Sequence, residues 1–190
     1  MTQKTFFDPQ KQQKHIVDVA DLLDRNKDKG LKSTLLIGAG CSKSAGIPLG
    51  DEFVEIVKKN YLEAYNKAPK KTFFDCMSAL QEEQRHRLIR KYIDKSKINM
   101  THIALACLLK HRYIDRVLTT NFDSLVIRAC AMMGFIPSVY DLTAGQYFRI
   151  DLATYPAVVH LHGQGNGFVM LTTQEQVKEN YEQLRPVFED

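Results

Sequence analysis

A short apolar run, Ser33–Ile37 (STLLI), ends directly in a glycine and constrains the fold more than any other feature of this chain. Its apolar residues follow one another instead of alternating with polar ones. That pattern is typical of a strand buried on both faces of a parallel sheet, and not of an exposed edge strand. We therefore expect Ser33–Ile37 to be a buried strand of a parallel sheet.

The rest of the chain alternates between strand-like and helix-like segments. Strands are predicted at Ile114–Thr119, Ile136–Tyr140 and Ala157–Leu161, with a further short candidate at Phe168–Leu171. Helical spacing predicts helices at Gln10–Lys27, from Asp51, in two or three pieces over Thr72–Lys110, and at Phe122–Met133. Thr172 and Glu175 form a capping-box pattern before a last helix. This alternation predicts an α/β fold, with a Rossmann-like parallel sheet, helices on both faces and a helical insertion at about residues 51–110.

The composition fits a single ordinary globular domain over residues 1–190. With 190 residues, of which 44% are hydrophobic and 25% charged, the chain can bury a core without disulfides or metal. The longest apolar stretches, Ile103–Leu109 and Leu125–Met133, are too short to span a membrane. The first residues, MTQKTFFDPQKQQKH, lack the apolar core of a signal peptide. We expect a cytoplasmic protein without membrane contact.

The cysteines stand tens of residues apart, at Cys41, Cys76, Cys107 and Cys130. No CxxC pair is present in the sequence, so we expect no structural zinc and no other metal. In a cytoplasmic protein these thiols are expected to be reduced and mostly buried.

The net charge of +4 is too small to indicate nucleic-acid binding by itself. One local excess occurs at Gln84–Lys97 (QRHRLIRKYIDKSK), where six basic residues stand against the single acid Asp94. Such a run is usually the solvated face of a helix. Contact with nucleic acid is therefore expected only through this face, if at all.

The loop after the first strand reads GAGCSKSAGIP, from Gly38 to Pro48. Two glycines separated by one residue let the backbone approach a pyrophosphate, whose charge backbone amides and a helix N-terminus stabilise. The usual oxidoreductase fingerprint has its third glycine three positions after the second, where this chain has Lys43; the next glycine is Gly46. The loop thus predicts dinucleotide binding without favouring a dehydrogenase. Many strand-to-helix turns, however, contain such a pair and bind nothing.

A second polar segment, Thr119–Asp123 (TTNFD), follows the strand at Ile114–Thr119. Open α/β sheets bind ligands at the carboxyl ends of their strands, so this segment is placed to contact one. Asn121 can donate and accept hydrogen bonds, and Asp123 can hold a carboxamide or a ribose hydroxyl. The simpler alternative is that both residues only cap the following helix.

A third segment, His160–Gly163 (HLHG), follows the strand at Ala157–Leu161. Alternation places His160 and His162 on one face if the strand continues, and Gly163 frees the chain to turn beside a ligand. One of the two histidines is a candidate general base. The remaining histidines are interpreted as structural or exposed, and His102 is expected to hold the helix that leads into the second strand; they are His15, His86, His102 and His111.

In order and rough spacing, GAGCSKSAGIP, TTNFD and HLHG resemble the NAD-binding signatures of the sirtuin family. The similarity covers about Leu31–Gly163. It implies that Ala39, Ser42, Ile47 and Pro48 line the nicotinamide and phosphate site, that Asn121 and Asp123 form the nicotinamide-ribose pocket, and that His162 is catalytic. The full set of expected NAD-binding residues is Gly38, Ala39, Gly40, Ser42, Gly46, Ile47, Pro48, Thr120, Asn121, Asp123, His162 and Gly163.

Two departures from the sirtuin pattern indicate which branch this chain resembles. Sirtuin deacylases have Asp-Phe-Arg after the proline of the loop, where this chain has Leu49, Gly50 and Asp51. They also carry a four-cysteine zinc module after the catalytic histidine, where this chain reads GQGNGFVMLTTQEQ. The chain is more similar to zinc-less sirtuin-like domains of bacterial anti-phage defence proteins, which degrade NAD+.

The expected activity is therefore NAD+ glycohydrolysis, with NAD+ as substrate and a homo-oligomer or a partner defence protein as the assembly. Nicotinamide leaves as a neutral molecule, so no strong general acid is required. Asn121 would orient the ribose hydroxyls or the attacking water, His162 would act as base, and Asp123 would fix the nicotinamide end. The alternatives are an NAD-dependent protein deacylase and a non-catalytic domain that senses NAD or ADP-ribose or mediates oligomerisation.

The resemblance also carries an expectation about the C-terminal end of the chain. Sirtuin-like domains continue past the catalytic histidine into further strands that contact the adenosine half of NAD. Here only one predicted helix follows before Asp190. We expect the chain to be the N-terminal part of a longer protein and to lack the C-terminal strands of the fold.

Overall fold

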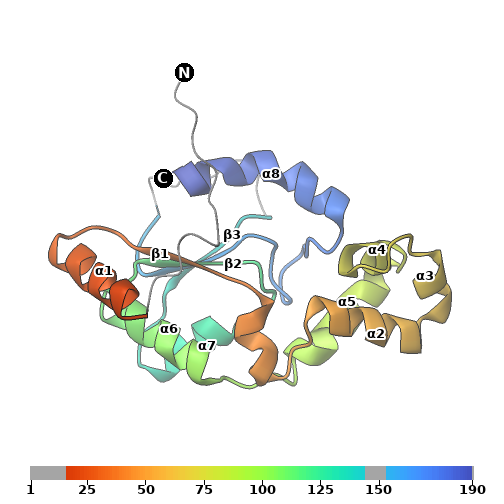
Figure 1. Ribbon diagram of the computed structural model, residues 1–190, viewed down its shortest axis with the longest axis horizontal. Helices are drawn as coiled ribbons and strands as arrows, with labels where there is room; N and C mark the ends of the chain where they lie inside the picture. The colour runs from red at the N-terminus through yellow and green to blue at the C-terminus, as the bar shows by residue number, and fades with distance from the viewer. Residues whose placement is uncertain (1–15, 144–152, 190) are drawn as a thin grey trace.

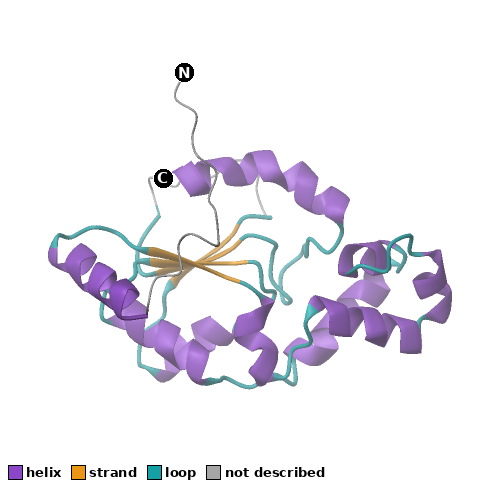
Figure 2. Ribbon diagram, in the orientation of Figure 1, coloured by secondary structure: helices purple, strands orange, loops and turns teal. Residues whose placement is uncertain are grey.

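The computed structural model describes residues 16–143 and 153–189 and has an α/β architecture around one parallel sheet (Figures 1 and 2). Its strands are β1 (Thr34–Ile37), β2 (Arg116–Thr119), β3 (Ser138–Asp141) and β4 (Ala157–His160), in the spatial order β1-β2-β4-β3. All three pairings are parallel. The predicted Rossmann-like parallel sheet is confirmed.

Helices cover both faces of this sheet. Figure 1 shows α1, α6 and α7 on one side of the sheet, α8 on the other, and α2 to α5 as a separate group beside it. The bounds are α1 Ile16–Asp28, η2 Ala39–Ala45 (a 3₁₀ helix), α2 Gly50–Asn60, α3 Leu62–Lys67, α4 Phe73–Ser78, α5 Glu82–Ile93, α6 Met100–Lys110, α7 Leu125–Met132 and α8 Gln174–Glu189. The predicted start of the first helix at Gln10, and His15 with it, lies outside the described residues. No helix in the described part of the chain combines the length and apolar character needed to cross a bilayer.

The register of the sheet makes the carboxyl ends of the strands level. Ile37 pairs with Thr119, and Thr119 pairs in turn with His160. His160 also pairs with Asp141, the last residue of β3. The segments that follow β1, β2 and β4 therefore leave the sheet side by side, along one edge.

β1 differs from its prediction as a buried strand. Within the described residues it lies at an edge of the sheet, and its exposure alternates, with Leu36 62% exposed. The strands buried throughout are β2 and β4. The physical reason is strand order, because among the four described strands β2 and β4 alone have a neighbour on each side.

Phe168–Leu171 also differs from its prediction as a short strand. It makes a single isolated antiparallel bridge, between Gly163 and Met170, and Phe168 is 99% exposed. The capping box before α8 lies one residue later than predicted. Gln176 N donates to Thr173 Oγ1 at 3.3 Å, and Gln176 Oε1 accepts from the backbone amide of Thr173 at 3.1 Å.

The predicted helical insertion is shorter than residues 51–110. Helices α2 to α5 pack around a core of their own that includes Val57, Cys76 and Met77. α6 instead packs against α7, and its Leu105 and Leu109 join the core beneath β2 and β4. α6 is thus the crossover helix that leads into β2, and the insertion consists of α2 to α5.

Gly163 is required by the fold in two ways. Its φ of 87° lies in the left-handed region, which favours glycine. A Cβ atom at this position would also lie 2.1 Å from the backbone oxygen of Val169 and 3.1 Å from Thr143 Oγ1. The Val169 backbone and the Thr143 side chain leave no room for a side chain at this position.

We expect Gly163→Ala to destabilise the protein by about 3 kcal/mol or more, because backbone strain and a backbone overlap add. Gly134→Ala is the matched control, since Gly134 has a φ of 81° but open space around its Cβ position. That control should lose only about 1 kcal/mol. Urea unfolding of both variants measures the difference, and equal losses would show that the Val169 contact carries no cost.

Candidate functional site

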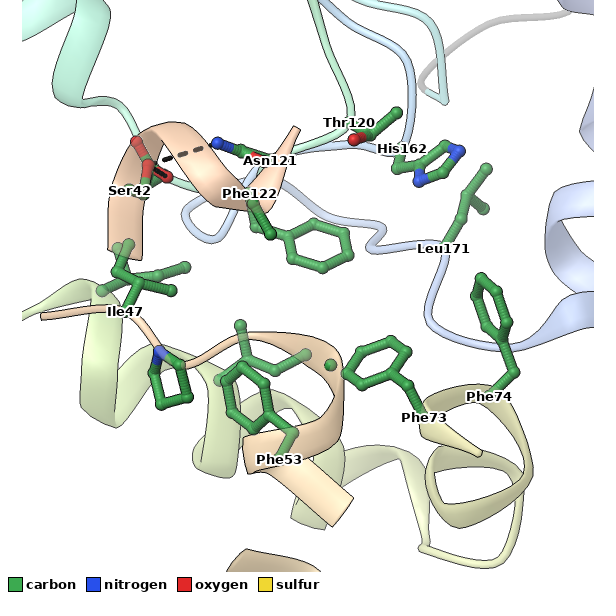
Figure 3. Close-up of a pocket in the computed structure, with 16 residues that line it drawn as sticks. Ser42, Ile47, Phe53, Phe73, Phe74, Thr120, Asn121, Phe122, His162 and Leu171 are labelled. Atoms are coloured by element: carbon green, nitrogen blue, oxygen red, sulfur yellow. Dashed lines mark hydrogen bonds between the residues drawn. The ribbon is translucent and has the colours of Figure 1, made fainter. Parts of the chain in front are cut away.

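A cavity of about 260 Å³ opens at the carboxyl edge of the sheet, where the level strand ends bring the three polar segments together (Figure 3). It lies between the sheet and the insertion, and both contribute side chains. Its lining is Ala39, Ser42, Ile47, Pro48, Gly50, Phe53, Phe73, Phe74, Ile89, Ile93, Thr120, Asn121, Phe122, Asp123, His162 and Leu171. All three segments singled out in the sequence contribute to this one cavity.

Eight of the twelve residues expected to bind NAD line the cavity: Ala39, Ser42, Ile47, Pro48, Thr120, Asn121, Asp123 and His162. The four that do not line it are the glycines Gly38, Gly40, Gly46 and Gly163. Two of these glycines have a structural role instead. Gly46 ends η2 with a φ of 96°, and Gly163 makes the tight contact described above.

The hydroxyl of Ser42 joins the segments that follow β1 and β2. Ser42 is 1% exposed, and its Oγ donates to Asp123 Oδ2 at 2.8 Å. It accepts from Asn121 Nδ2 at 3.2 Å and lies 3.3 Å from His102 Nε2. A hydroxyl has one donor and two acceptor positions, so the Ser42 hydroxyl is fully hydrogen-bonded within the protein.

His102 is the member of this network that the sequence patterns did not place in the site. It was expected to hold the helix that leads into β2, and it does so. Asn99 Oδ1 accepts from the His102 amide at 3.1 Å, and His102 Nδ1 accepts from the Asn99 amide at 3.2 Å. Nδ1 therefore carries no proton, and Nε2–H donates to Ser42. Burial lowers the pKa of His102, which agrees with this neutral form.

Asp123 has two structural hydrogen bonds. Its Oδ1 accepts from the Leu125 amide at 3.0 Å, in the first turn of α7, while Oδ2 accepts from Ser42. Asp123 therefore holds the first amide of α7 as the capping alternative expected, although the N-cap residue itself is Ser124. Asp123 is buried at 7% exposure and still lines the cavity, so its carboxyl group belongs to the polar face of that space.

Asn121 is held through its side-chain nitrogen and its backbone. Nδ2 donates to Gly38 O and to Ser42 Oγ, both at 3.2 Å. The backbone amide donates to Thr119 Oγ1 at 3.0 Å. With Nδ2 committed to two acceptors, Oδ1 is the side-chain atom suited to accept a hydrogen bond from a ligand.

The two histidines of HLHG have different environments, because β4 ends at His160 and the alternation expected for a longer strand stops there. His160 is 1% exposed and does not line the cavity, whereas His162 is half-buried and lines it. Burial lowers the pKa of His162. Of the pair, only His162 lines the cavity, and its lowered pKa favours the neutral imidazole.

An aromatic wall faces these polar groups, and it comes mainly from the insertion. Figure 3 shows Phe53, Phe73 and Phe74 opposite Asn121 and Ser42. Phe53 and Phe73 pack edge to face with centroids 5.8 Å apart, as do Phe73 and Phe74 at 5.6 Å. In the sequence these residues form the apolar faces of helices. The same pattern is expected of side chains that fill a core, so the sequence does not indicate that these line a cavity.

The glycine loop does not lead directly into a long helix. Residues Ala39–Ala45 form the 3₁₀ helix η2, and α2 begins only at Gly50. The helix N-terminus expected beside the glycine pair is therefore that of a short 3₁₀ helix. Lys43 Nζ pairs with Glu52, whose Oε2 also accepts from the Leu49 amide at 2.8 Å. This pairing ties the loop to the start of α2.

Some of the basic side chains in the run Gln84–Lys97 already have partners within the protein. Arg85 Nη1 donates to the carbonyl oxygens of Leu80 at 2.8 Å and Met77 at 3.3 Å, so its charge serves the C-terminal end of α4. Arg87 pairs with Glu83 at 2.8 Å. Nucleic-acid contact through this face stays a prediction.

No group of three or more potential metal ligands occurs among residues 16–143 and 153–189.

A scan against models of known protein families finds no match for this chain, and a search of curated proteins finds no significantly similar sequence. The residues themselves therefore carry the functional argument.

Three buried or half-buried histidines predict acid sensitivity. Burial lowers the pKa of His102, His160 and His162, so each binds a proton more readily in the unfolded chain. Their contribution to stability is complete above the ordinary histidine pKa of about 6.5 and falls as the pH drops below it. We expect the melting temperature to fall by on the order of 5 °C between about pH 7.5 and about pH 5.5.

Circular dichroism melts of the wild type and of His102→Gln test this expectation. The variant should lose part of the pH dependence, because it removes one buried ring. His111→Gln is the control, since it removes an exposed histidine. A melting temperature that stays constant or rises on acidification would contradict the prediction.

Proposed function

We propose that this protein is an NAD+ glycohydrolase that cleaves the bond between nicotinamide and ribose. The observation that carries the proposal is the meeting of Asn121, Asp123 and His162 with the loop Gly38–Pro48 around one cavity at the carboxyl edge of a parallel sheet. Ligands of open α/β sheets bind at this edge. The resemblance of the same segments to sirtuin NAD-binding signatures supports the choice of ligand.

The size of the cavity fits one end of the dinucleotide. Drug-sized ligands occupy pockets of about 300–1,000 Å³, so a cavity of about 260 Å³ accommodates a nicotinamide ring with part of its ribose. The aromatic wall from Phe53 to Phe74 offers the flat apolar surface that such a ring requires. The phosphates would then lie along the glycine loop, where Ala39 and Gly40 are exposed.

Each polar residue of the cavity has a proposed task. Asn121 would accept a hydrogen bond from a ribose hydroxyl or from the attacking water through Oδ1. Asp123 would place negative charge near the nicotinamide end. His162 would accept the proton that water loses as it bonds to the ribose carbon, while the bonding electron pair leaves with neutral nicotinamide. A neutral imidazole can perform this step.

The proposed biological role is depletion of NAD+ in bacterial anti-phage defence. It rests on the resemblance to zinc-less sirtuin-like domains of defence proteins. A protein deacylase is the alternative within the same family, and the absence of cysteines between His162 and Asp190 in the sequence argues against its zinc module. A domain that senses NAD or ADP-ribose without turnover is the alternative from another class.

Nicotinamide release from NAD+, measured with and without an acetyl-lysine peptide, separates these functions. We expect release in both conditions at similar rates, because water is the proposed acceptor. Asn121→Ala and His162→Ala should each lower the rate by about 10²–10⁴-fold, the range of a lost acid–base or orienting group. Release that requires the peptide would identify a deacylase, and binding without release would identify a sensor.

The control for these variants is His111→Ala, which removes an exposed imidazole that does not line the cavity. It should keep wild-type turnover. If Asn121→Ala and His162→Ala behaved like this control, the assignment of the catalytic residues would be wrong.

Gly40 tests the proposed phosphate path separately from catalysis. Its Cβ position is in open space and its φ lies outside the left-handed region, so the fold does not demand glycine there. Gly40→Ala should therefore change the unfolding free energy by less than about 0.5 kcal/mol. It should weaken NAD+ binding by about tenfold, because the added methyl group would meet the ligand.

Calorimetric titration with NAD+ in a His162→Ala background measures this effect without consuming the ligand. Urea unfolding of the same protein checks its stability. Unchanged affinity in Gly40→Ala would place the phosphates elsewhere.

A further inference from the structure

His160 is a buried histidine that the proposed reaction does not use. It is the last residue of β4, it is 1% exposed, and it does not line the cavity. Its Nδ1 lies 3.1 Å from the backbone carbonyl oxygen of Asn121. This contact links β4 to the segment after β2, directly behind a residue of the candidate site.

The other ring nitrogen fixes the tautomer of His160. Nε2 is buried and has no hydrogen-bond partner among the described residues. A proton on Nε2 would be a buried donor without an acceptor, which is costly, so the proton resides on Nδ1. Burial lowers the pKa of His160, against smaller opposite effects of the Asn121 carbonyl and of Asp141 and Asp123. The ring is therefore neutral, and Nδ1–H donates to Asn121.

This bond completes the constraints on Asn121. Its amide donates to Thr119, its Nδ2 donates to Gly38 and Ser42, and its carbonyl accepts from His160. The hydrogen bond to Thr119 is local along the chain, and the two hydrogen bonds of Nδ2 are made to residues of the glycine loop. Among the described residues, only the His160 bond holds the Asn121 carbonyl itself from the β4 side, and the next carbonyl, that of Phe122, accepts from Gly165 at 2.7 Å. Without the His160 bond, the Asn121 carbonyl would lose its partner and the Asn121–Phe122 peptide would be held at one end only.

We propose that His160 is a positioning residue that sets the orientation of the Asn121 side chain through a hydrogen bond to its backbone carbonyl. Its catalytic consequence rests on the proposed function, since it matters for turnover only if Asn121 acts on NAD+. The competing explanation is that the ring only fills space beneath the site.

Two amide substitutions separate positioning from packing. In His160→Asn the side-chain nitrogen can occupy the place of Nδ1, so the donor to Asn121 is kept although volume is lost. In His160→Gln the longer side chain keeps more volume but carries its nitrogen toward the place of Nε2, where none of the described residues offers an acceptor. Positioning predicts that Asn replaces His160 better than Gln, and packing predicts the reverse.

The kinetic test compares nicotinamide release from NAD+ by the wild type and both variants. We expect His160→Asn to keep kcat within about threefold of the wild type. His160→Gln should lower kcat on the order of tenfold to a hundredfold with little change in KM, because Asn121 is displaced within a site that is still formed. The opposite ranking, or an equal effect of both variants, would overturn the proposal.

A spectroscopic test needs no turnover. Nitrogen-15 NMR of the histidine rings should show His160 as the neutral Nδ1–H tautomer near neutral pH. The Asn121 carbonyl carbon should shift in His160→Gln and stay near its wild-type value in His160→Asn. A charged ring, an Nε2–H tautomer or an unchanged carbonyl in His160→Gln would overturn the proposal.

The two tests also keep failures distinguishable. If the wild type released no nicotinamide, the proposed function would fail, while the tautomer and the carbonyl shift would still decide whether His160 holds Asn121. If the wild type turned over NAD+ but the Nδ1 bond were absent, only the positioning role would fail.

Discussion

The three hydrogen bonds of the Ser42 hydroxyl hold the candidate site together. Through them the loop after β1 is joined to Asp123 and Asn121, which follow β2, and to His102 at the start of α6. Ser42 is 1% exposed, and in such a low-dielectric environment an unsatisfied polar group is expensive. These segments therefore cannot shift independently, and the cavity is shaped before any ligand arrives.

The insertion supplies the aromatic wall of the cavity, which the sheet edge lacks. The polar groups come from the ends of β1, β2 and β4, whereas the aromatic wall comes mainly from α2 and α4. The segment after β4 contacts both the sheet edge and the insertion. Gly165 donates to the Phe122 carbonyl at 2.7 Å, and a Cβ at Gly165 would come within 2.6 Å of Ile93 Cδ1. Met170 lies in the core of the insertion. One face of the cavity is thus polar and the other apolar, in agreement with the proposed binding of nicotinamide and its ribose.

The predictions that failed share one cause: each outcome depends on contacts between distant parts of the chain, which a local sequence pattern does not encode. STLLI reads as a buried strand, yet its place at the sheet edge depends on strand order, which no local pattern encodes. Phe168–Leu171 has strand-like residues, yet it forms only the isolated bridge of Met170 with Gly163, beside which the Leu171 amide donates to the His162 carbonyl at 2.8 Å. α6 was assigned to the insertion because its helical pattern continues the preceding one. Its burial against α7 and the sheet is a long-range property.

The sequence by itself determined the parallel α/β fold and the three polar segments, because apolar periodicity and strand-end glycines act over a few residues. It also placed those segments at strand ends, and parallel strands with level ends bring them together. Only the tertiary structure decided that His162 and not His160 faces the cavity, that His102 bonds to Ser42 across 60 positions, and that the phenylalanines of the insertion form its apolar wall. Those outcomes depend on contacts between distant parts of the chain, and the free energy of such contacts is set by packing rather than by local pattern.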